Sequence, residues 1–446
     1  MSVMKISAPL QQRYNFCNIS GRVTRYAFKY AFKKNSFNGG MSLPLLNFRE
    51  LSYRSPFQVG KYSFLCYIKP KYCCLFKHWR CDVKQNGETL NLLKHFESLG
   101  IPGLDCIVFQ KGKCVFRYQS GFSDEEKTQS VNGSERYNIY SCSKLITCTA
   151  ALMLVEKGII RIDDAVHEYL PEFKHMKKIV DGNLEDVKNT MTLRHLFTMT
   201  SGLTYNVDSE NLKRGIAETN GTMQTREAMK YLACDPLAFE PGSSWLYSLS
   251  HDVLAAIVEV VSGKRFGEFV KENIFDIIGM KRSTFLLPEE ELSEVAAQYQ
   301  YDSENGQYIP CSKGVQITKF GSKYESGGGG CISTVDDYIA FLEALRQFRL
   351  LKPETIARMT APQISLACDE AYWQRFPDRN YTYGLGVRCP LPGKNAPDYG
   401  WTGAGGAFLA ILPKEEITIF YVQQVLKSII RPLRGKIRDS VLKDIG

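Results

Sequence analysis

The sequence has no long apolar run, although 44% of its 446 residues are hydrophobic. No run approaches the roughly 18–20 residues that a membrane-spanning helix needs. The first residues also lack the compact apolar segment and the small-residue cleavage site of a secretory signal. We therefore expect no integral membrane segment and a cytoplasmic location. The hydrophobic content is that of a globular chain with a substantial core.

The sequence also lacks a disulfide framework, in spite of its 14 cysteines. Apart from Cys73 beside Cys74, and Cys142 and Cys148 on one predicted helix, the cysteines are scattered singly. There is no CxxC pair and no Cys/His cluster with the spacing of zinc ligands. Reduced thiols in a cytosolic compartment are the simplest interpretation. We expect neither a metal ion nor a cofactor.

Acidic residues are almost absent from the first fifth of the chain. Residues 1–81 hold 14 Lys and Arg but a single acid, Glu50, whereas the rest hold 42 Lys and Arg and 46 Asp and Glu. The net charge of +9 therefore comes from the N-terminal segment. The remaining body is mildly acidic, which argues against nucleic acid as a partner of that surface.

Residues 1–81 show no helix or strand period over a useful length. One interpretation is a basic arm that binds membrane lipid or nucleic acid. The interpretation we favour is a disordered or non-native leader, such as a translation start assigned too early. The ordered pattern begins near Asn91, so residues 82–446 are expected to form the folded domain.

Strands are expected at both ends of the ordered part, with helices between them. Alternating runs on both sides of Gly112 predict a hairpin, and apolar residues at helical spacing predict the helices. The expected fold class is α/β in the α+β sense: a mainly antiparallel sheet flanked by helices, plus an inserted helical subdomain. The expected strands are 105–110, 114–118, 383–387, 407–412 and 417–422, and the expected helices are 90–99, 146–160, 193–198, 225–232, 251–261, 266–274, 336–345 and 427–442.

The first candidate for chemistry is the run Ser141-Cys142-Ser143-Lys144. A serine and a lysine three apart on a helix lie on one side, about 5–6 Å apart at Cβ. A serine in the first turn points toward the positive end of the helix dipole, and a lysine with a lowered pKa can take its proton. Ser-x-x-Lys is ordinarily a solvated helix turn and occurs here three times. Only this copy opens a long apolar helix after a strand-like run.

Two further segments carry residues that such a site would use. Tyr247-Ser248-Leu249 follows a Pro-Gly turn. A tyrosine beside a lysine can share its proton, although a core aromatic is the ordinary interpretation. The run from Gly400 to Gly406 opens a strand pair; glycines let the backbone approach a ligand, and the amide of Ala404 can donate to an oxyanion. A bulged strand start is the ordinary interpretation of that run.

Together, and in this order, the three segments resemble the serine β-lactamase-like (penicillin-recognising) superfamily, which includes class C β-lactamases, D-alanyl-D-alanine peptidases and family VIII carboxylesterases. The resemblance covers about residues 89 to 425 and leaves residues 1–88 without a counterpart. It implies that Ser141 is acylated, with Lys144 as its general base and Tyr247 assisting proton transfer. It also implies that the amides of Ser141 and Ala404 bind the oxyanion. Further signatures are Leu99-Gly100-Ile101-Pro102-Gly103, Leu154-Val155-Glu156-Lys157-Gly158, Tyr169-Leu170-Pro171-Glu172-Phe173, Thr200-Ser201-Gly202-Leu203, Ile278-Gly279-Met280 and the run from Gly329 to Asp337.

Two positions depart from the family pattern. The Asn expected two residues after the tyrosine is Leu249, and the Lys or His expected to open the third motif is Trp401. Trp401 with Gly403 resembles the W-x-G form of family VIII esterases. Both changes remove polar recognition and add apolar surface, and both positions are expected, like Gly403, to contact the substrate. Arg388 or Lys394 is an alternative cation from outside the motif.

The expected function is hydrolysis of a small-molecule ester or amide through a covalent acyl-enzyme, with an esterase-like preference. The alternatives are a β-lactamase or D-alanyl-D-alanine carboxypeptidase and, outside the enzymes, an idle relative that binds peptides or cell-wall fragments. Ser141, Lys144 and Tyr247 count against the idle relative, because binding alone needs none of their chemistry. His195 and His251 are expected to act as cap or core residues, since neither stands in a G-x-S-x-G setting.

Removal of residues 1–81 is expected to leave folding and activity unchanged, because the segment has no apolar periodicity and little buried area would be lost. A chain that begins at Asp82 should match the full chain in solubility, Tm and ester hydrolysis. A clear drop in Tm or rate would show that the segment is part of the fold.

Overall fold

The computed structural model of the chain describes residues 87–311 and 320–445, and it places four short strands nearer the N-terminus. By its contacts the chain divides into two units, Met1–Leu75 and Phe76–Gly446. Residues 1–81 lie outside the part of the chain whose side chains are described, so the interpretations offered for them remain predictions. The four strands are β1 (Asn15–Cys17), β2 (Val23–Arg25), β3 (Phe57–Val59) and β4 (Tyr62–Phe64).

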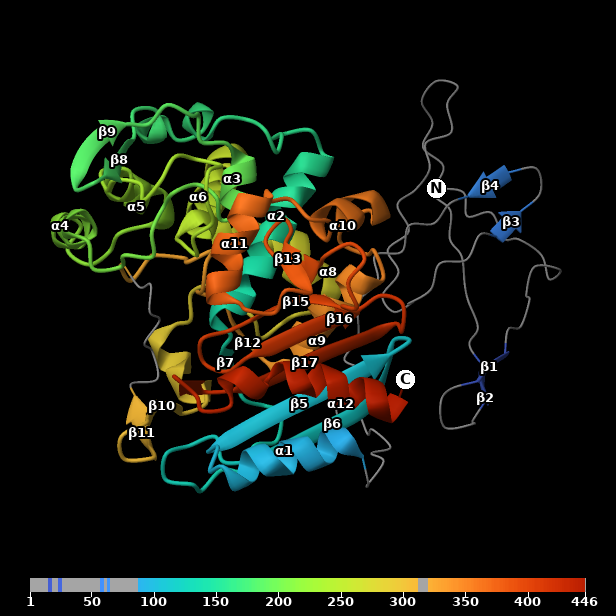
Figure 1. Ribbon diagram of the computed structural model, residues 1–446. Helices are drawn as coiled ribbons and strands as arrows, with labels where there is room; N and C mark the ends of the chain where they lie inside the picture. Colours follow the sequence, from blue (N-terminus) through green and yellow to red (C-terminus); the bar gives the residue numbers. More distant parts are fainter. Residues whose placement is uncertain are drawn as a thin grey trace. The chain divides into compact units, whose positions relative to one another are not determined.

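A seven-stranded sheet organises the larger unit (Figure 1). Its order is β13-β14-β15-β16-β17-β5-β6 and each neighbouring pair is antiparallel, so the hairpin that opens the domain lies beside its last long strand. The expected mainly antiparallel sheet is confirmed. Its strands are β5 (Gly103–Gln110), β6 (Lys113–Gly121), β13 (Tyr381–Tyr383), β14 (Arg388–Pro390), β15 (Tyr399–Thr402), β16 (Phe408–Leu412) and β17 (Ile417–Gln423).

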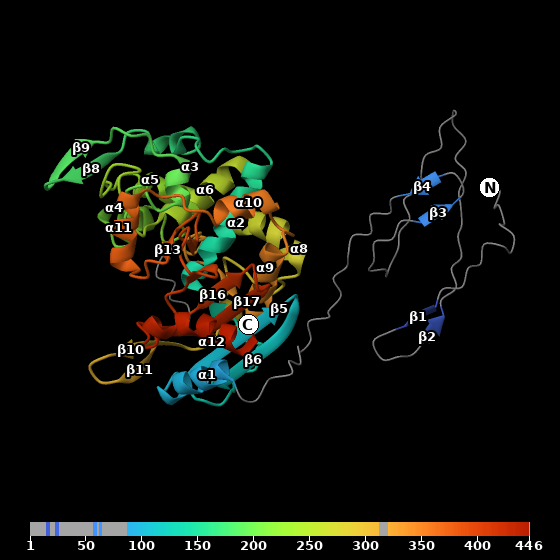
Figure 2. The ribbon, with the colours of Figure 1, turned by 45° about the vertical axis from the view of Figure 1, so that its right-hand side comes forward.

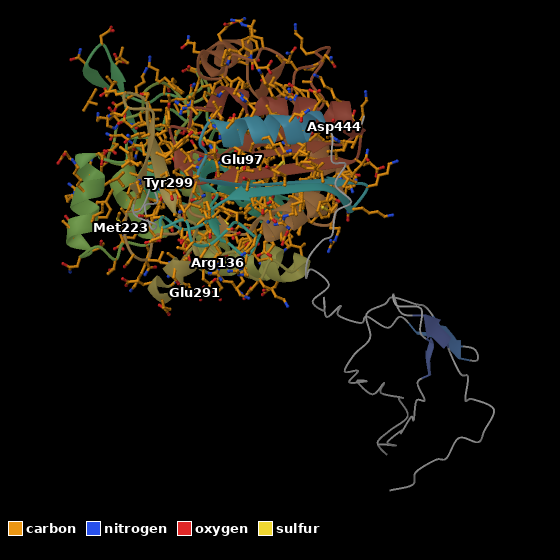
Figure 3. The ribbon with its side chains drawn as sticks, turned by 90° about the horizontal axis from the view of Figure 1, so that it is seen from below. Glu97, Arg136, Met223, Glu291, Tyr299 and Asp444 are labelled. Carbon is orange, nitrogen blue, oxygen red and sulfur yellow. The ribbon has the colours of Figure 1, made fainter. Side chains whose placement is uncertain are left out.

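Alternation along the strands gives the sheet two apolar faces. Cys106 and Val108 of β5 pack with α1 (Glu88–Ser98) and α12 (Gly435–Ile445), whereas Ile107 and Phe109 face the other way. Helices α1 and α12 lie together on the first face, with Asp444 at one end of the pair (Figure 3).

The carboxylate of Asp444 ties the last helix to the first. Its oxygens accept hydrogen bonds from the amides of Glu88 and Thr89 at 2.8 and 2.9 Å. These amides belong to the first turn of α1, where no intrahelical acceptor is available and negative charge is favoured. Farther along α1, Glu97 accepts hydrogen bonds from the hydroxyls of Tyr118 and Ser120 on β6, which fixes α1 against the sheet.

The second face carries α9 (Val335–Arg346) and, beyond α2 (Ser143–Glu156), the inserted helical part (Figures 1 and 2). Residues 143–154 of α2 are all buried, as expected of a helix that is apolar nearly all round. The remaining helices are α3 (Leu193–Phe197), α4 (Glu210–Glu218), α5 (Thr225–Leu232), α6 (Ser250–Ser262), α7 (Phe266–Val270), α8 (Asp276–Ile278), α10 (Pro353–Met359) and α11 (Leu366–Arg375).

Four of the helices predicted in the middle of the chain, 193–198, 225–232, 251–261 and 336–345, are confirmed to within one residue at each end. Small strand pairs complete the unit. They are β7 (Tyr137–Asn138) with β12 (Ile332–Ser333), β8 (Lys177–Val180) with β9 (Asn183–Asp186), and β10 (Gln298–Asp302) with β11 (Gln307–Cys311) and β18 (Val425–Leu426).

Several expected boundaries are wrong. The strand expected at 383–387 is β13 and β14 with a turn between them, where Gly386 takes a left-handed φ of +85°. The helix expected from 427 begins at Gly435, because residues 425–426 pair with β10 and a 3-10 turn follows at Arg431–Leu433. The helix expected at 266–274 is α7 followed by a π-helical turn, Lys271–Phe275.

Eight cysteines of the described part are free, whereas Cys114 is disulfide-bonded, which contradicts the expectation that all thiols are reduced. Across residues 87–311 and 320–445, every helix is too short or too polar to cross a bilayer.

Candidate active site

Ser141 lies where strand β7 gives way to helix α2. The 3-10 turn Tyr140–Cys142 leads directly into α2, so Ser141 sits at the positive end of that helix. Tyr140 has a left-handed φ of +47°, which is uncommon for a residue with a side chain. Its hydroxyl donates to Gln298 Oε1 at 2.5 Å and holds the turn in place. Ser141 itself is half-buried, and within the described part of the chain its Oγ makes no hydrogen bond.

Lys144 lies in the first turn of α2 and is fully buried. Its Nζ donates to the carbonyl oxygen of Gly328 at 2.5 Å, and lies 4.6 Å from the ring centre of Tyr247 and 5.5 Å from that of Tyr205. Burial lowers the pKa of Lys144, but Tyr247, Tyr205 and Asp252 outweigh it and raise that pKa above its ordinary value. This is opposite to the lowered pKa expected from the sequence. Lys144 therefore keeps its proton in the resting site.

Asp252 supplies a buried negative charge near Lys144. It lies in the first turn of α6, and its Oδ1 accepts hydrogen bonds from the hydroxyls of Tyr324 and Ser326 at 2.8 and 2.7 Å. Its Oδ2 has no donor within residues 87–311 and 320–445. A Cβ atom on Gly328 would overlap that Oδ2 and lie 3.3 Å from Lys144 Nζ. The two charges therefore face the same glycine, although the described ion pairs do not join them directly.

The glycine run Gly327–Gly330 lets the chain pass close to both α2 and α6. A Cβ atom on Gly327 would overlap the carbonyl oxygen of His251 and lie 2.6 Å from Ala255 Cβ. From α2, Thr147 Oγ1 donates to the Gly327 carbonyl at 2.7 Å. This close fit explains why the run consists of glycines, and it brings the carbonyl of Gly328 to Lys144.

Tyr247 stands among aromatic rings. Its ring stacks with Tyr205 at 5.5 Å and 8°, and with Trp401 at 5.9 Å and 22°. Trp401 Nε1 also donates to the Tyr247 hydroxyl at 3.4 Å. The indole at the position of the family's cation is thus both an apolar wall and a hydrogen-bond donor to Tyr247.

Sequence reasoning missed Asp252 and Tyr205. Tyr205 lies two residues after the signature Thr200-Ser201-Gly202-Leu203, which is the signal that would have pointed to it. Asp252 lies five residues after Tyr247, and no motif spacing marked it.

The glycine-rich turn after β15 lies against the segment that carries Ser141. A Cβ atom on Gly403 would lie 2.5 Å from the carbonyl oxygen of Ile139, so this close approach requires glycine. Ala404 is exposed, and its backbone amide has no hydrogen-bond partner among the described residues. A free amide on a turn packed against the Ser141 segment is the arrangement that an oxyanion donor needs.

The other singled-out residues lie behind this cluster. Leu249 is fully buried in the core, so it can shape the site only through its neighbours. His195 Nδ1 accepts from the Thr192 amide at 3.1 Å and caps α3. His251 is fully buried beside Cys148, and burial together with the Lys144 charge lowers its pKa to about 3, so it stays neutral. The two histidines thus hold the cap and core roles expected of them.

The candidate residues meet where the helical part joins the sheet. Ser141 and Lys144 come from the start of α2, Tyr247 from the loop before α6, and Trp401 and Ala404 from the end of β15 and the turn after it. In the part of the chain that the structure describes, no group of His, Cys, Asp and Glu is arranged to hold a metal ion.

Comparisons with known proteins agree with this architecture. The esterase EstB of Burkholderia gladioli is 30% identical over 279 residues, which cover 57% of this chain and 68% of EstB. The acyltransferase calJ of Penicillium decumbens is 31% identical over 245 residues, which cover 51% of this chain and 56% of calJ. This alignment therefore spans little more than half of the acyltransferase.

Solved structures show the same fold at lower identity. The LovD6 mutant of simvastatin synthase from Aspergillus terreus superposes with a TM-score of 0.67 at 22% identity, covering 80% of this chain and 96% of that one. A penicillin-binding protein from Bacillus halodurans superposes with a TM-score of 0.59 at 18% identity, covering 79% of this chain and 99% of that one. The family model described as Beta-lactamase matches residues 90–433. The chain therefore belongs to the Beta-lactamase family, within the serine β-lactamase-like superfamily that also holds esterases and acyltransferases.

Proposed function

We propose that the protein hydrolyses an ester or amide through a covalent acyl-enzyme on Ser141, with a preference for esters. The observation that carries the proposal is the placement of Lys144 and Tyr247 side by side, with Nζ 4.6 Å from the ring centre, one turn from Ser141. The free amide of Ala404, on a turn packed against the Ser141 segment, supports it. The esterase EstB among the relatives supports it too.

In the proposed reaction Ser141 Oγ attacks the substrate carbonyl carbon and its proton passes to the Lys144–Tyr247 pair. The amides of Ser141 and Ala404 stabilise the oxyanion, and the pair returns the proton to the leaving group. Water then repeats the sequence on the acyl-enzyme. Since Lys144 holds a proton at rest, the pair must lose one before it can accept that of Ser141. The donor bond from Trp401 to Tyr247 stabilises negative charge on the phenol oxygen when that happens.

Acyl transfer to an alcohol is a second candidate, because calJ is an acyltransferase. The same acyl-enzyme would form, and an alcohol would replace water in the second half. Adding a primary alcohol to the ester assay and measuring the new ester by mass spectrometry distinguishes the two.

Ser141→Ala is expected to abolish both turnover and labelling by a fluorophosphonate probe, and Lys144→Ala nearly so. The pair acts as a unit, so the double variant should be little worse than either single one. Tyr247→Phe should lose roughly 10²–10⁴-fold in rate, the usual range for a general acid or base. Peptide mapping that placed the adduct on Ser143 or Ser248 would overturn the assignment.

The rate of 4-nitrophenyl butyrate hydrolysis is expected to go on rising with pH above neutrality, because Lys144 acts as a base only when deprotonated and its pKa is raised. Asp252→Asn removes the negative charge near Lys144 but keeps an oxygen for Tyr324 and Ser326. It should therefore move the rising limb of kcat/KM to lower pH.

The control is Glu259→Gln, on the same helix but bonded to the amides of Arg226 and Phe266. Other titratable groups near Lys144 include Tyr205, Tyr247, Cys142, Cys148 and the neutral His251. If the rising limb of kcat/KM lies at the same pH in Asp252→Asn as in Glu259→Gln and the wild type, the Asp252 carboxylate does not govern the charge of Lys144.

Short-chain esters are expected to be better substrates than β-lactams, by orders of magnitude in kcat/KM. A lactam carries a carboxylate beside its scissile bond, and burying that charge against the Trp401 indole without a cation costs several kcal/mol. Comparing 4-nitrophenyl butyrate with nitrocefin on one preparation tests this, and Trp401→Lys should gain on nitrocefin. Fast nitrocefin hydrolysis by the wild type would refute the ester preference.

A further inference from the structure

Arg375, the last residue of α11, lies at the rim of the aromatic cluster. Its Cζ is 5.1 Å from the ring centre of Tyr247 and 5.9 Å from that of Phe376. The side chain is exposed, and within residues 87–311 and 320–445 no carboxylate pairs with it. A cation that sequence reasoning did not consider thus stands over the ring of the proposed acid–base tyrosine.

The neighbouring arginines are engaged with acids. Arg388, one of the two alternative cations suggested by the sequence, forms an ion pair with the fully buried Asp398. Arg379 lies over a tryptophan ring, 4.7 Å from the centre of Trp373, and its guanidinium also pairs with Glu370 at 3.1 Å. Arg375 shares the ring contact but not the acid, so its donors are free for a ligand.

A stabilising role alone accounts for part of this placement. A cation in the last turn of a helix is favoured by the dipole, and a guanidinium over an exposed ring gains about 0.5–1 kcal/mol. Neither of these two stabilising effects requires that the ring belong to a proposed catalytic residue. The charge of Arg375 also reaches a second residue of the cluster: burial raises the pKa of the Tyr205 hydroxyl, and Arg375 is one of the charges that oppose the rise.

We propose that Arg375 binds a carboxylate carried by the substrate, so that the preferred substrates are esters or amides whose acyl chain ends in a carboxylate. The inference rests on the proposed function, because it concerns the substrate of that same site. The planar fork of a guanidinium matches a carboxylate with two parallel hydrogen bonds, which an ammonium does not. A flexible acyl chain lets the carboxylate reach Arg375 while the scissile carbonyl lies at Ser141.

The experiment compares the 4-nitrophenyl monoester of glutaric acid, which carries a free carboxylate, with its methyl ester, which is neutral. Both release 4-nitrophenolate, and the readout is the ratio of their kcat/KM values. The wild type should favour the monoanion. Arg375→Gln should lower the ratio at least about tenfold, mainly through KM, and Arg375→Lys should restore part of it. Monoesters of succinic and adipic acid then measure the length of chain that the site accepts.

Arg379→Gln is the matched control, because it removes an exposed arginine from beside α11 that already has an acid. It should leave the ratio unchanged. A ratio that Arg375→Gln does not alter, with both substrates unaffected or slowed equally, would overturn the assignment; equal slowing would show that Arg375 acts on Tyr247 instead. Loss of nitrocefin turnover in Arg375→Gln would support the assignment while contradicting the ester preference.

A binding measurement separates this inference from the proposed function. Titration calorimetry of Ser141→Ala with the two esters needs no turnover. If Ser141→Ala binds the monoanion more tightly than the neutral ester, and the double variant Ser141→Ala with Arg375→Gln does not, the carboxylate site is supported. This holds even if the wild type hydrolyses neither ester and does not react with the fluorophosphonate probe. That combination would overturn the hydrolase proposal alone. Equal binding of the two esters would overturn the Arg375 assignment alone.

Discussion

The fully buried ammonium of Lys144 is the constraint around which the site is organised. An isolated charge in a protein interior costs several kcal/mol unless it is hydrogen-bonded and opposed by other charge. Here the Gly328 carbonyl accepts from Nζ, two phenol rings face it, and the Asp252 carboxylate lies across the glycine. The glycine run, the apolar α2 and the first turn of α6 all serve this one group, because each brings or shields a partner of Lys144.

Trp401 fits the same constraint. A cation at that position would add positive charge next to an already charged lysine, whereas the indole adds none. Its N–H still donates to the Tyr247 hydroxyl, so the phenol oxygen keeps a donor. In the proposed site the cation that recognises the substrate is Arg375 at the rim, and not a residue at position 401 of β15. The positive charge that can meet a substrate therefore lies on the exposed side of Tyr247.

The sheet and its two layers follow from local pattern, since strands alternate with period two and each face then needs a helical cover. One of the wrong boundaries lies where a long-range contact overrides local preference. Residues 425–426 pair with β10 instead of joining the last helix. Helix α11 was not expected at all; its Tyr372 packs on Trp245, far away in the sequence. Arg375 was overlooked with this helix, because it is the last residue of it.

The sequence by itself determined the fold class, the family resemblance and the candidates Ser141, Lys144, Tyr247, Trp401 and Ala404, because motif spacing and periodicity are local properties. Only the tertiary structure decided their surroundings. Tyr247, Tyr205 and Asp252 reach Lys144 from other segments, and together they reverse the expected direction of its pKa. A pKa is set by the desolvation and the charges within a few ångströms, and a linear sequence does not state which residues those will be.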